Sequence, residues 1–129
     1  DVMVKNNEGV FVKNPSEVSS GDVILDIGPF ASAELASLAR GARFVLWNGP
    51  LGDYLTSGFE KSSIVFAKAV AESHAFSIVG GGDTAALIEE QKLGASFGFI
   101  SSGGGAMLEF LAKGTLPGIE ALKNSVTLS

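Results

Sequence analysis

The chain has 129 residues, 46% of them hydrophobic, which suits one domain with a buried core and is too short for two of ordinary size. Nine basic and 14 acidic residues give a formal charge of −5 without any basic cluster, which disfavours nucleic acid and anionic membrane surfaces as partners. Cysteine is absent, so disulfides, thiolate zinc sites and cysteine nucleophiles are excluded, and no apolar stretch approaches the length of a membrane span.

Short apolar runs alternate with helical patterns, and this alternation predicts βα units around a mainly parallel sheet. The expected strands are Val2–Val4, Val23–Ile27, Phe44–Trp47, Phe76–Val79 and Phe97–Ile100, with a short extra strand at Gly9–Val12. The expected helices are Ala31–Arg40, Phe59–Ser73, Thr84–Lys92 and Ala106–Ala112, followed by a short helical segment at Ile119–Lys123 and a loosely held polar tail. Continuous apolar strands suit a sheet that is covered on both faces, so we predict an α/β fold with helices on both sides.

Two glycine triplets, Gly80-Gly81-Gly82 and Gly103-Gly104-Gly105, each follow an expected strand and open an expected helix. Glycine allows a ligand to approach the backbone N–H groups closely, and a helix N-terminus adds unpaired donors with a partial positive charge. The two junctions therefore predict two neighbouring anion-binding sites and point to phosphate chemistry.

Two common phosphate motifs do not explain these junctions. The string from Gly80 to Ala85 formally satisfies the dinucleotide pattern G-x-G-x-x-A, but the following strand ends in Ile100-Ser101-Ser102 without the acidic residue that would hold a ribose. A Walker A loop is also excluded, because the chain contains no G-x-x-x-x-G-K-[ST] string.

Asp83 and Thr84 follow the first triplet, and each has two interpretations. Asp83 is either the N-cap of its helix only, or a carboxylate that coordinates Mg²⁺ on a nucleotide, since hard cations prefer oxygen ligands. The Thr84 hydroxyl likewise bonds either the backbone or a phosphate. Both alternatives stay open on the sequence.

A tryptophan motif, Trp47-Asn48-Gly49-Pro50-Leu51-Gly52, ends another expected strand, where ligands of open α/β sheets collect. Together with four further motifs it resembles phosphoglycerate kinase, in order and spacing, over essentially the whole chain. The other motifs are Asp26-Ile27-Gly28-Pro29, Gly80-Gly81-Gly82-Asp83-Thr84, Ser102-Gly103-Gly104-Gly105 with Leu108-Glu109-Phe110, and Leu116-Pro117-Gly118.

The resemblance implies that residues 1–129 are the C-terminal portion of the nucleotide-binding domain, roughly the last third of the enzyme, as a partial Rossmann-like three-layer domain. It assigns Asp83 to the metal of a Mg²⁺–ATP or Mg²⁺–ADP complex and Thr84 to a nucleotide phosphate. The nucleotide site would also include Asn48, Gly80, Gly81 and Gly82, and the catalytic loop facing the transferring phosphoryl group would be Gly103, Gly104 and Gly105.

One stretch departs from the family pattern. Asp53, Tyr54 and Leu55 stand where the family has Val-Phe-Glu for adenine and ribose, and Ser62-Ser63 replaces the usual Gly-Thr. These differences support a competing hypothesis, a non-catalytic anion-binding or structural piece.

The resemblance further implies a cytoplasmic enzyme of glycolysis that transfers a phosphoryl group between 1,3-bisphosphoglycerate and ADP. Its 3-phosphoglycerate site would lie in an N-terminal domain that this sequence does not include. We therefore expect the isolated chain to have no appreciable kinase turnover, and to self-associate through a sheet edge left without its neighbouring strand.

Overall fold

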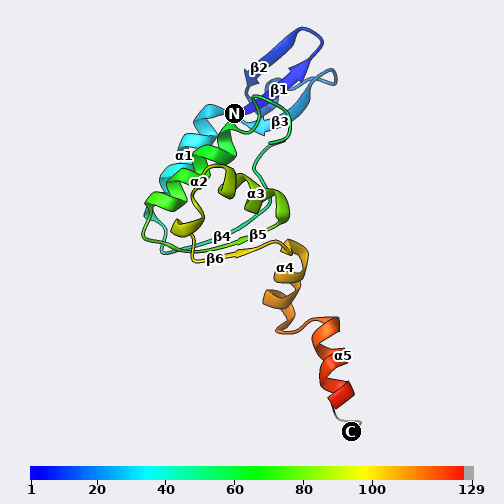
Figure 1. Ribbon diagram of the computed structural model, residues 1–129. Coiled ribbons are helices and arrows are strands. Elements are labelled where there is room, and N and C mark those ends of the chain that lie inside the picture. Colours follow the sequence, from blue (N-terminus) through cyan, green and yellow to red (C-terminus); the bar gives the residue numbers. More distant parts are fainter. Residues whose placement is uncertain (127–129) are drawn as a thin grey trace.

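The computed structural model describes residues 1–126 (Figure 1). The strands are β1 Val2–Asn6, β2 Gly9–Lys13, β3 Val23–Ile27, β4 Phe44–Asn48, β5 Phe76–Gly80 and β6 Phe99–Ser101. The helices are α1 Pro29–Gly41, α2 Lys61–Glu72, α3 Gly82–Glu90, α4 Gly104–Lys113 and α5 Pro117–Val126, with 3₁₀ turns at Pro15–Glu17 and Gly94–Ser96. The tail expected to be loosely held is helical up to Val126, and its last residues, 127–129, lie outside the described residues.

The strands form two sheets rather than one. Strands β4, β5 and β6 are parallel, as predicted, whereas β1, β2 and β3 form a separate antiparallel sheet in the order β2-β1-β3. The expectation that Val2–Val4 and Val23–Ile27 belong to the parallel sheet is therefore wrong. Only two residues join β1 to β2, and such a short link permits only antiparallel pairing. The side chain of Asn6 supports the turn by accepting hydrogen bonds from the N–H groups of Glu8 and Gly9.

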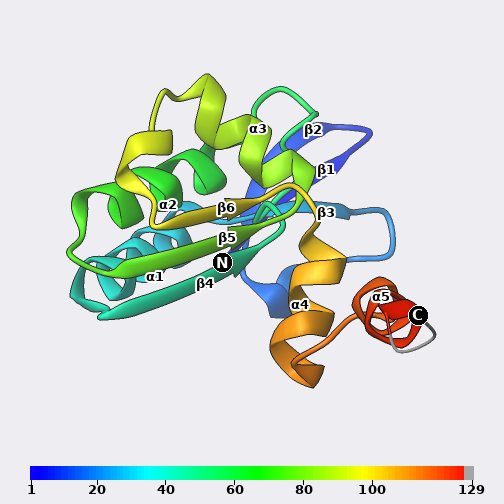
Figure 2. The same ribbon diagram turned by 60° about the horizontal axis from the view of Figure 1, so that its bottom comes forward.

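Helices lie on both sides of the parallel sheet, which confirms the predicted α/β class. Figure 1 shows α1, α2 and α3 on one side of this sheet and α4 on the other, and Figure 2 shows α4 near the ends of β5 and β6. Helix α4 covers only part of the sheet face on which it lies. The uncovered side chains, each between 46% and 56% exposed, are Phe44, Leu46, Phe76 and Phe99.

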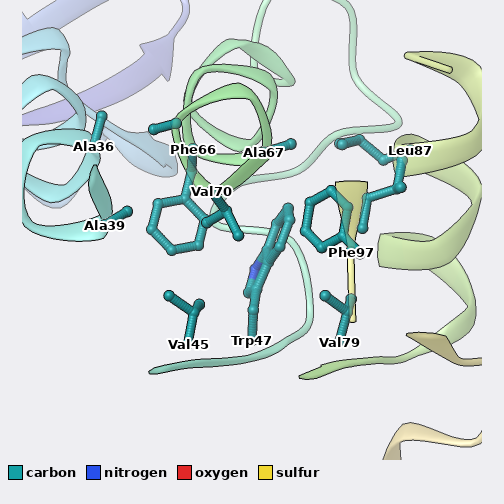
Figure 3. Close-up of a cluster of buried hydrophobic side chains, with 12 residues drawn as sticks. Ala36, Ala39, Val45, Trp47, Phe66, Ala67, Val70, Val79, Leu87 and Phe97 are labelled. Carbon is teal, nitrogen blue, oxygen red and sulfur yellow. The ribbon is translucent and has the colours of Figure 1, made fainter. Parts of the chain in front are cut away.

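The main core lies on the other side of the sheet, beneath α1, α2 and α3. Figure 3 shows Trp47 between Phe66 and Phe97 in this cluster. The rings of Trp47 and Phe66 meet edge to face, with centroids 5.0 Å apart and planes at 87°. Edge-to-face contact adds stability beyond the buried area of the rings. This core fixes β4 and β5 side by side, and thereby aligns the residues that follow them.

A carboxylate beside the antiparallel sheet, that of Asp22, accepts hydrogen bonds from several donors. Asp22 accepts hydrogen bonds from Lys13 Nζ at 2.7 Å, Ser19 N at 2.8 Å and Asn6 Nδ2 at 2.8 Å. The Lys13 ammonium, the Ser19 backbone N–H and the Asn6 amide hold the pKa of Asp22 well below its usual range. Because these donors favour the ionised form, the carboxylate ties the β1–β2 hairpin to the 19–22 turn.

This network predicts an acid-sensitive contribution to stability. A carboxyl whose folded pKa is depressed stabilises the fold fully above its unfolded pKa, which is about 3.9 for aspartate, and loses that contribution as the pH falls through the folded pKa. We therefore expect Asp22→Asn to be less stable than the original chain at pH 7 and to lose less stability between pH 5 and pH 2. Urea midpoints over this range would measure the difference. Glu8→Gln, in the same hairpin, is the control, and an equal effect of both substitutions would contradict the prediction.

Candidate active site

The carboxyl ends of the three parallel strands are in register. Asn48 at the end of β4 pairs with Gly80 on β5, and Gly80 pairs with Ser101 on β6. Helix α3 begins two residues after the end of β5, and α4 begins three residues after the end of β6. The two predicted strand–glycine–helix junctions are therefore neighbours at one edge of the sheet, where open α/β folds bind ligands.

At the first junction, Gly81 is the N-cap of α3 and has φ 101°. That positive φ is strained for residues with a side chain. The N–H of Gly81 donates to Ser101 O at 3.0 Å, so it is already used between the strands. The first helical hydrogen bond runs from Ala85 N to Gly81 O, and among the described residues the N–H groups of Gly82, Asp83 and Thr84 have no partner.

The second junction repeats this arrangement. Gly103 is the N-cap of α4 and donates its N–H to Ser101 Oγ at 3.3 Å. The first helical bond runs from Met107 N to Gly103 O, which leaves the N–H groups of Gly104, Gly105 and Ala106 without partners in the described part of the chain. Two sets of free amide donors thus stand at adjacent helix N-termini, the arrangement that binds anions.

The side chain of Asn48 lies between the two junctions. Its Oδ1 would be 2.6 Å from a Cβ on Gly80 and would also collide with a Cβ on Gly104. A Cβ on Gly104 would further lie 2.7 Å from the backbone N of Gly81 and 2.9 Å from its Cα. The close approach of the two helix starts therefore requires glycine at position 104.

Thr84 is fully buried, and its hydroxyl accepts a hydrogen bond from Gly49 N at 3.1 Å. The same N–H also contacts Gly80 O at 3.3 Å. The first of the two interpretations of Thr84, a bond to backbone, is thus present, and its contact with a phosphate stays a prediction. Through this bond α3 holds the loop that follows β4.

Asp83 is the second residue of α3, and the N-cap is Gly81, which has no side-chain cap bond. The interpretation of Asp83 as the N-cap is therefore wrong, because the helix begins two residues earlier than expected. The Asp83 carboxylate is exposed, and among the described residues it makes no hydrogen bond or ion pair. Desolvation, together with the negative charges of Asp83 and Glu90, raises the pKa of Tyr54. Tyr54 therefore lies within electrostatic reach of this helix.

The loop after β4 is held by contacts that the sequence did not reveal. Trp47 Nε1 donates to Gly49 O at 2.7 Å, and Leu51 N donates to the buried Ser63 Oγ at 2.9 Å. Asp53 N donates to Leu25 O at 2.7 Å, which attaches the loop to β3. Leu55, which the resemblance aligns with the residue expected at the ribose, is 77% exposed. In the sequence, the departure of the Ser62-Ser63 pair from the family pattern marked this position, but it did not indicate that Ser63 Oγ accepts a hydrogen bond from Leu51 N.

The first junction places the exposed Asp83 carboxylate beside amide groups that have no partner among the described residues. No group of three or more His, Cys, Asp or Glu side chains in the described residues could hold a metal ion. Mg²⁺ is often bound by one or two carboxylates and completed by phosphate oxygens and water. Asp83 and the free amides beside it have the chemistry for such a complex. Among residues 1–126, no helix has the length and apolar character needed to cross a membrane.

A known protein family includes both glycine junctions in its sequence pattern. The sequence model of the phosphoglycerate kinase family matches residues 1–114. The chain belongs to the phosphoglycerate kinase family. The family match extends through both glycine junctions and ends just beyond α4.

Individual phosphoglycerate kinases are similar in sequence to this chain. The chain is 41% identical to the phosphoglycerate kinase of Francisella philomiragia over 97% of its own length, and 43% identical to that of Vibrio campbellii over 87%. It spans 32% and 29% of those proteins. Among solved structures, the Coxiella burnetii enzyme superposes with TM-score 0.80 and 38% identity over 99% of this chain, and the Pyrococcus horikoshii enzyme with TM-score 0.79 and 31% identity over 98%. The chain spans 34% and 32% of these two structures, so it corresponds to about a third of a phosphoglycerate kinase.

Proposed function

We propose that residues 1–129 are the C-terminal portion of the nucleotide-binding domain of a cytoplasmic phosphoglycerate kinase, and form one wall of its active site. The observation that carries the proposal is the pair of adjacent helix N-termini, each with free amide donors, beside the unpartnered carboxylate of Asp83 in the described part of the chain. The reaction of the complete enzyme would move a phosphoryl group between 1,3-bisphosphoglycerate and ADP.

In this proposal each junction has its own task. The N–H groups at the start of α3 bind the nucleotide phosphates, with Asn48 and Gly49 on their flank. The N–H groups of Gly104 and Gly105 face the phosphoryl group in transfer, where fixed donors stabilise charge without reorganising. Asp83 would hold the Mg²⁺ of the nucleotide, and bound Mg²⁺ neutralises the phosphate oxygens. Phosphoryl transfer depends mainly on positioning and charge stabilisation, so no protein nucleophile is needed.

The remaining two thirds of the relatives' length would supply the acceptor side. We propose that 3-phosphoglycerate or 1,3-bisphosphoglycerate binds only through the N-terminal domain, and that this chain alone gives no appreciable turnover in a coupled assay.

Mg²⁺–ADP binding tests the nucleotide assignment. Because the indole N–H of Trp47 bonds Gly49 O, movement of the loop on binding should change the fluorescence of Trp47. We expect the original chain to bind ADP more tightly with Mg²⁺ than without it, and Asp83→Asn to lose most of that difference, about tenfold in Kd. Glu89→Gln, an exposed carboxylate at the far end of α3, should leave the titration unchanged.

The competing hypothesis makes a different prediction for the same experiment. A weak anion site would bind pyrophosphate as tightly as ADP, without any dependence on Mg²⁺ or on Asp83. That result would replace the nucleotide site with a structural or anion-binding role.

A further inference from the structure

A second candidate binding site lies between the antiparallel sheet and the helices α1 and α2. It is a cavity of about 460 Å³, within the size range of small-molecule sites. Its walls are mainly apolar, with Met3, Val12 and Ile27 from the sheet and Ala33 and Val65 from the helices. No residue of either glycine triplet lines it. The cavity is thus separate from the proposed nucleotide site.

A buried carboxylate lines this cavity. Asp26 is 3% exposed, and its Oδ1 accepts hydrogen bonds from Ile27 N at 2.8 Å and from the Ser62 hydroxyl. Its Oδ2 has one distant donor, Ser62 N at 3.4 Å. An ionised carboxylate oxygen can accept more than one hydrogen bond, so Oδ2 retains acceptor capacity toward a ligand.

A buried hydroxyl lines the same cavity. Ser32 is 6% exposed, and its Oγ makes no hydrogen bond to any described residue. No fully buried side-chain polar atom in the described residues is left without a partner, so the Ser32 hydroxyl retains access to the cavity. Buried polar groups are normally satisfied, and this one is available to a ligand.

We propose that this cavity binds a small neutral apolar molecule that carries one hydrogen-bond donor, such as an aromatic alcohol. The apolar walls accommodate the body of the molecule, and Asp26 Oδ2 or Ser32 Oγ accepts its hydrogen bond. The charge of Asp26 disfavours an anion, and the exposed ammonium of Lys61 at the rim disfavours a cation. The proposal does not depend on the kinase assignment.

The test compares 4-methylphenol with toluene, which has nearly the same shape and lacks the donor. Titration of the 129-residue chain by NMR, observing both ligand and protein, should show 4-methylphenol binding about tenfold more tightly, as expected for a hydrogen bond to a charged acceptor. The shifted signals should come from α1, α2 and the antiparallel sheet. Ser32→Ala should leave the affinity for toluene unchanged. A narrower preference for 4-methylphenol in this variant would assign the acceptor to Ser32 Oγ, and an unchanged preference would assign it to Asp26 Oδ2.

Matched variants on α1 locate the site. Ala33 and Ser37 are both small and exposed on this helix, one turn apart, but only Ala33 lines the cavity. We expect Ala33→Phe to weaken 4-methylphenol binding at least tenfold and Ser37→Phe to leave it unchanged, with both variants folded by circular dichroism. Equal binding of the two ligands would mean an unselective apolar surface, such as one covered by another polypeptide segment, and would overturn the proposal. Equal effects of the two phenylalanine variants would overturn it as well.

Discussion

Replacing Gly104 with alanine is expected to destabilise the chain by about 2 kcal/mol, since overpacking a site that cannot relax typically costs this much. The new Cβ would lie 2.7 Å from Gly81 N and 2.9 Å from Gly81 Cα, and it would also meet Asn48 Oδ1. Two of these three neighbours are backbone atoms of the junction before α3. A flexible side chain could move aside, but the backbone of Gly81 is held at φ 101° and bonded to Ser101.

The adjacent glycine provides the matched control. A Cβ on Gly105 would meet no atom within 4 Å, and the residue lies in the first turn of α4. Gly105→Ala is therefore expected to stabilise the chain by about 0.5 to 1 kcal/mol, because alanine loses less backbone freedom on folding. Urea denaturation of both variants measures the difference. Equal effects would mean that the two junctions are not in contact.

The local architecture of the site could be predicted from sequence because its signals are local. A glycine triplet that follows an apolar run and precedes a helical pattern specifies a strand, a turn and a helix start within a few residues. The parallel pairing of β4, β5 and β6 then aligns Asn48, Gly80 and Ser101 at one edge. The resemblance of five ordered motifs to one family added the assignment of chemistry to these junctions.

The parts that could not be predicted depend on contacts between distant residues. The antiparallel pairing of β1 with β3 joins strands that are separated along the chain by β2 and a 3₁₀ helix. An apolar run alone does not reveal the direction of a strand. The start of α3 at Gly82 left Asp83 free of a capping role, although its sequence position suggested an N-cap. The Thr84 hydroxyl accepts its hydrogen bond from Gly49 N, 35 positions earlier in the chain. The residues around Thr84 do not indicate this contact.

Asp26 shows how such a distant contact connects the antiparallel sheet to α2 and to the loop after β4. Its carboxylate accepts hydrogen bonds from the backbone N and the hydroxyl of Ser62, 36 positions later, and so serves the N-terminal turn of α2. The N-cap of that helix, Glu60, makes no side-chain cap bond. A Cβ on Gly52 would collide with the Asp26 side chain, so the loop after β4 packs directly on this carboxylate. One residue of β3 therefore supports both a helix start and the loop beside the proposed nucleotide site.

Asp26→Ala is accordingly expected to destabilise the chain by about 3 kcal/mol, because it leaves three donors at a buried position without their acceptor. Ser62→Ala removes one of these donors and should cost less. In a double-mutant cycle the two substitutions should couple by about 1 to 2 kcal/mol, as contacting residues of one hydrogen-bond network do. Asp53→Ala is the control, because within residues 1–126 the Asp53 carboxylate bonds only Thr56, at an exposed position. Free energies of unfolding that add without coupling would show that Asp26 and Ser62 act independently, and that the cap on α2 lies elsewhere.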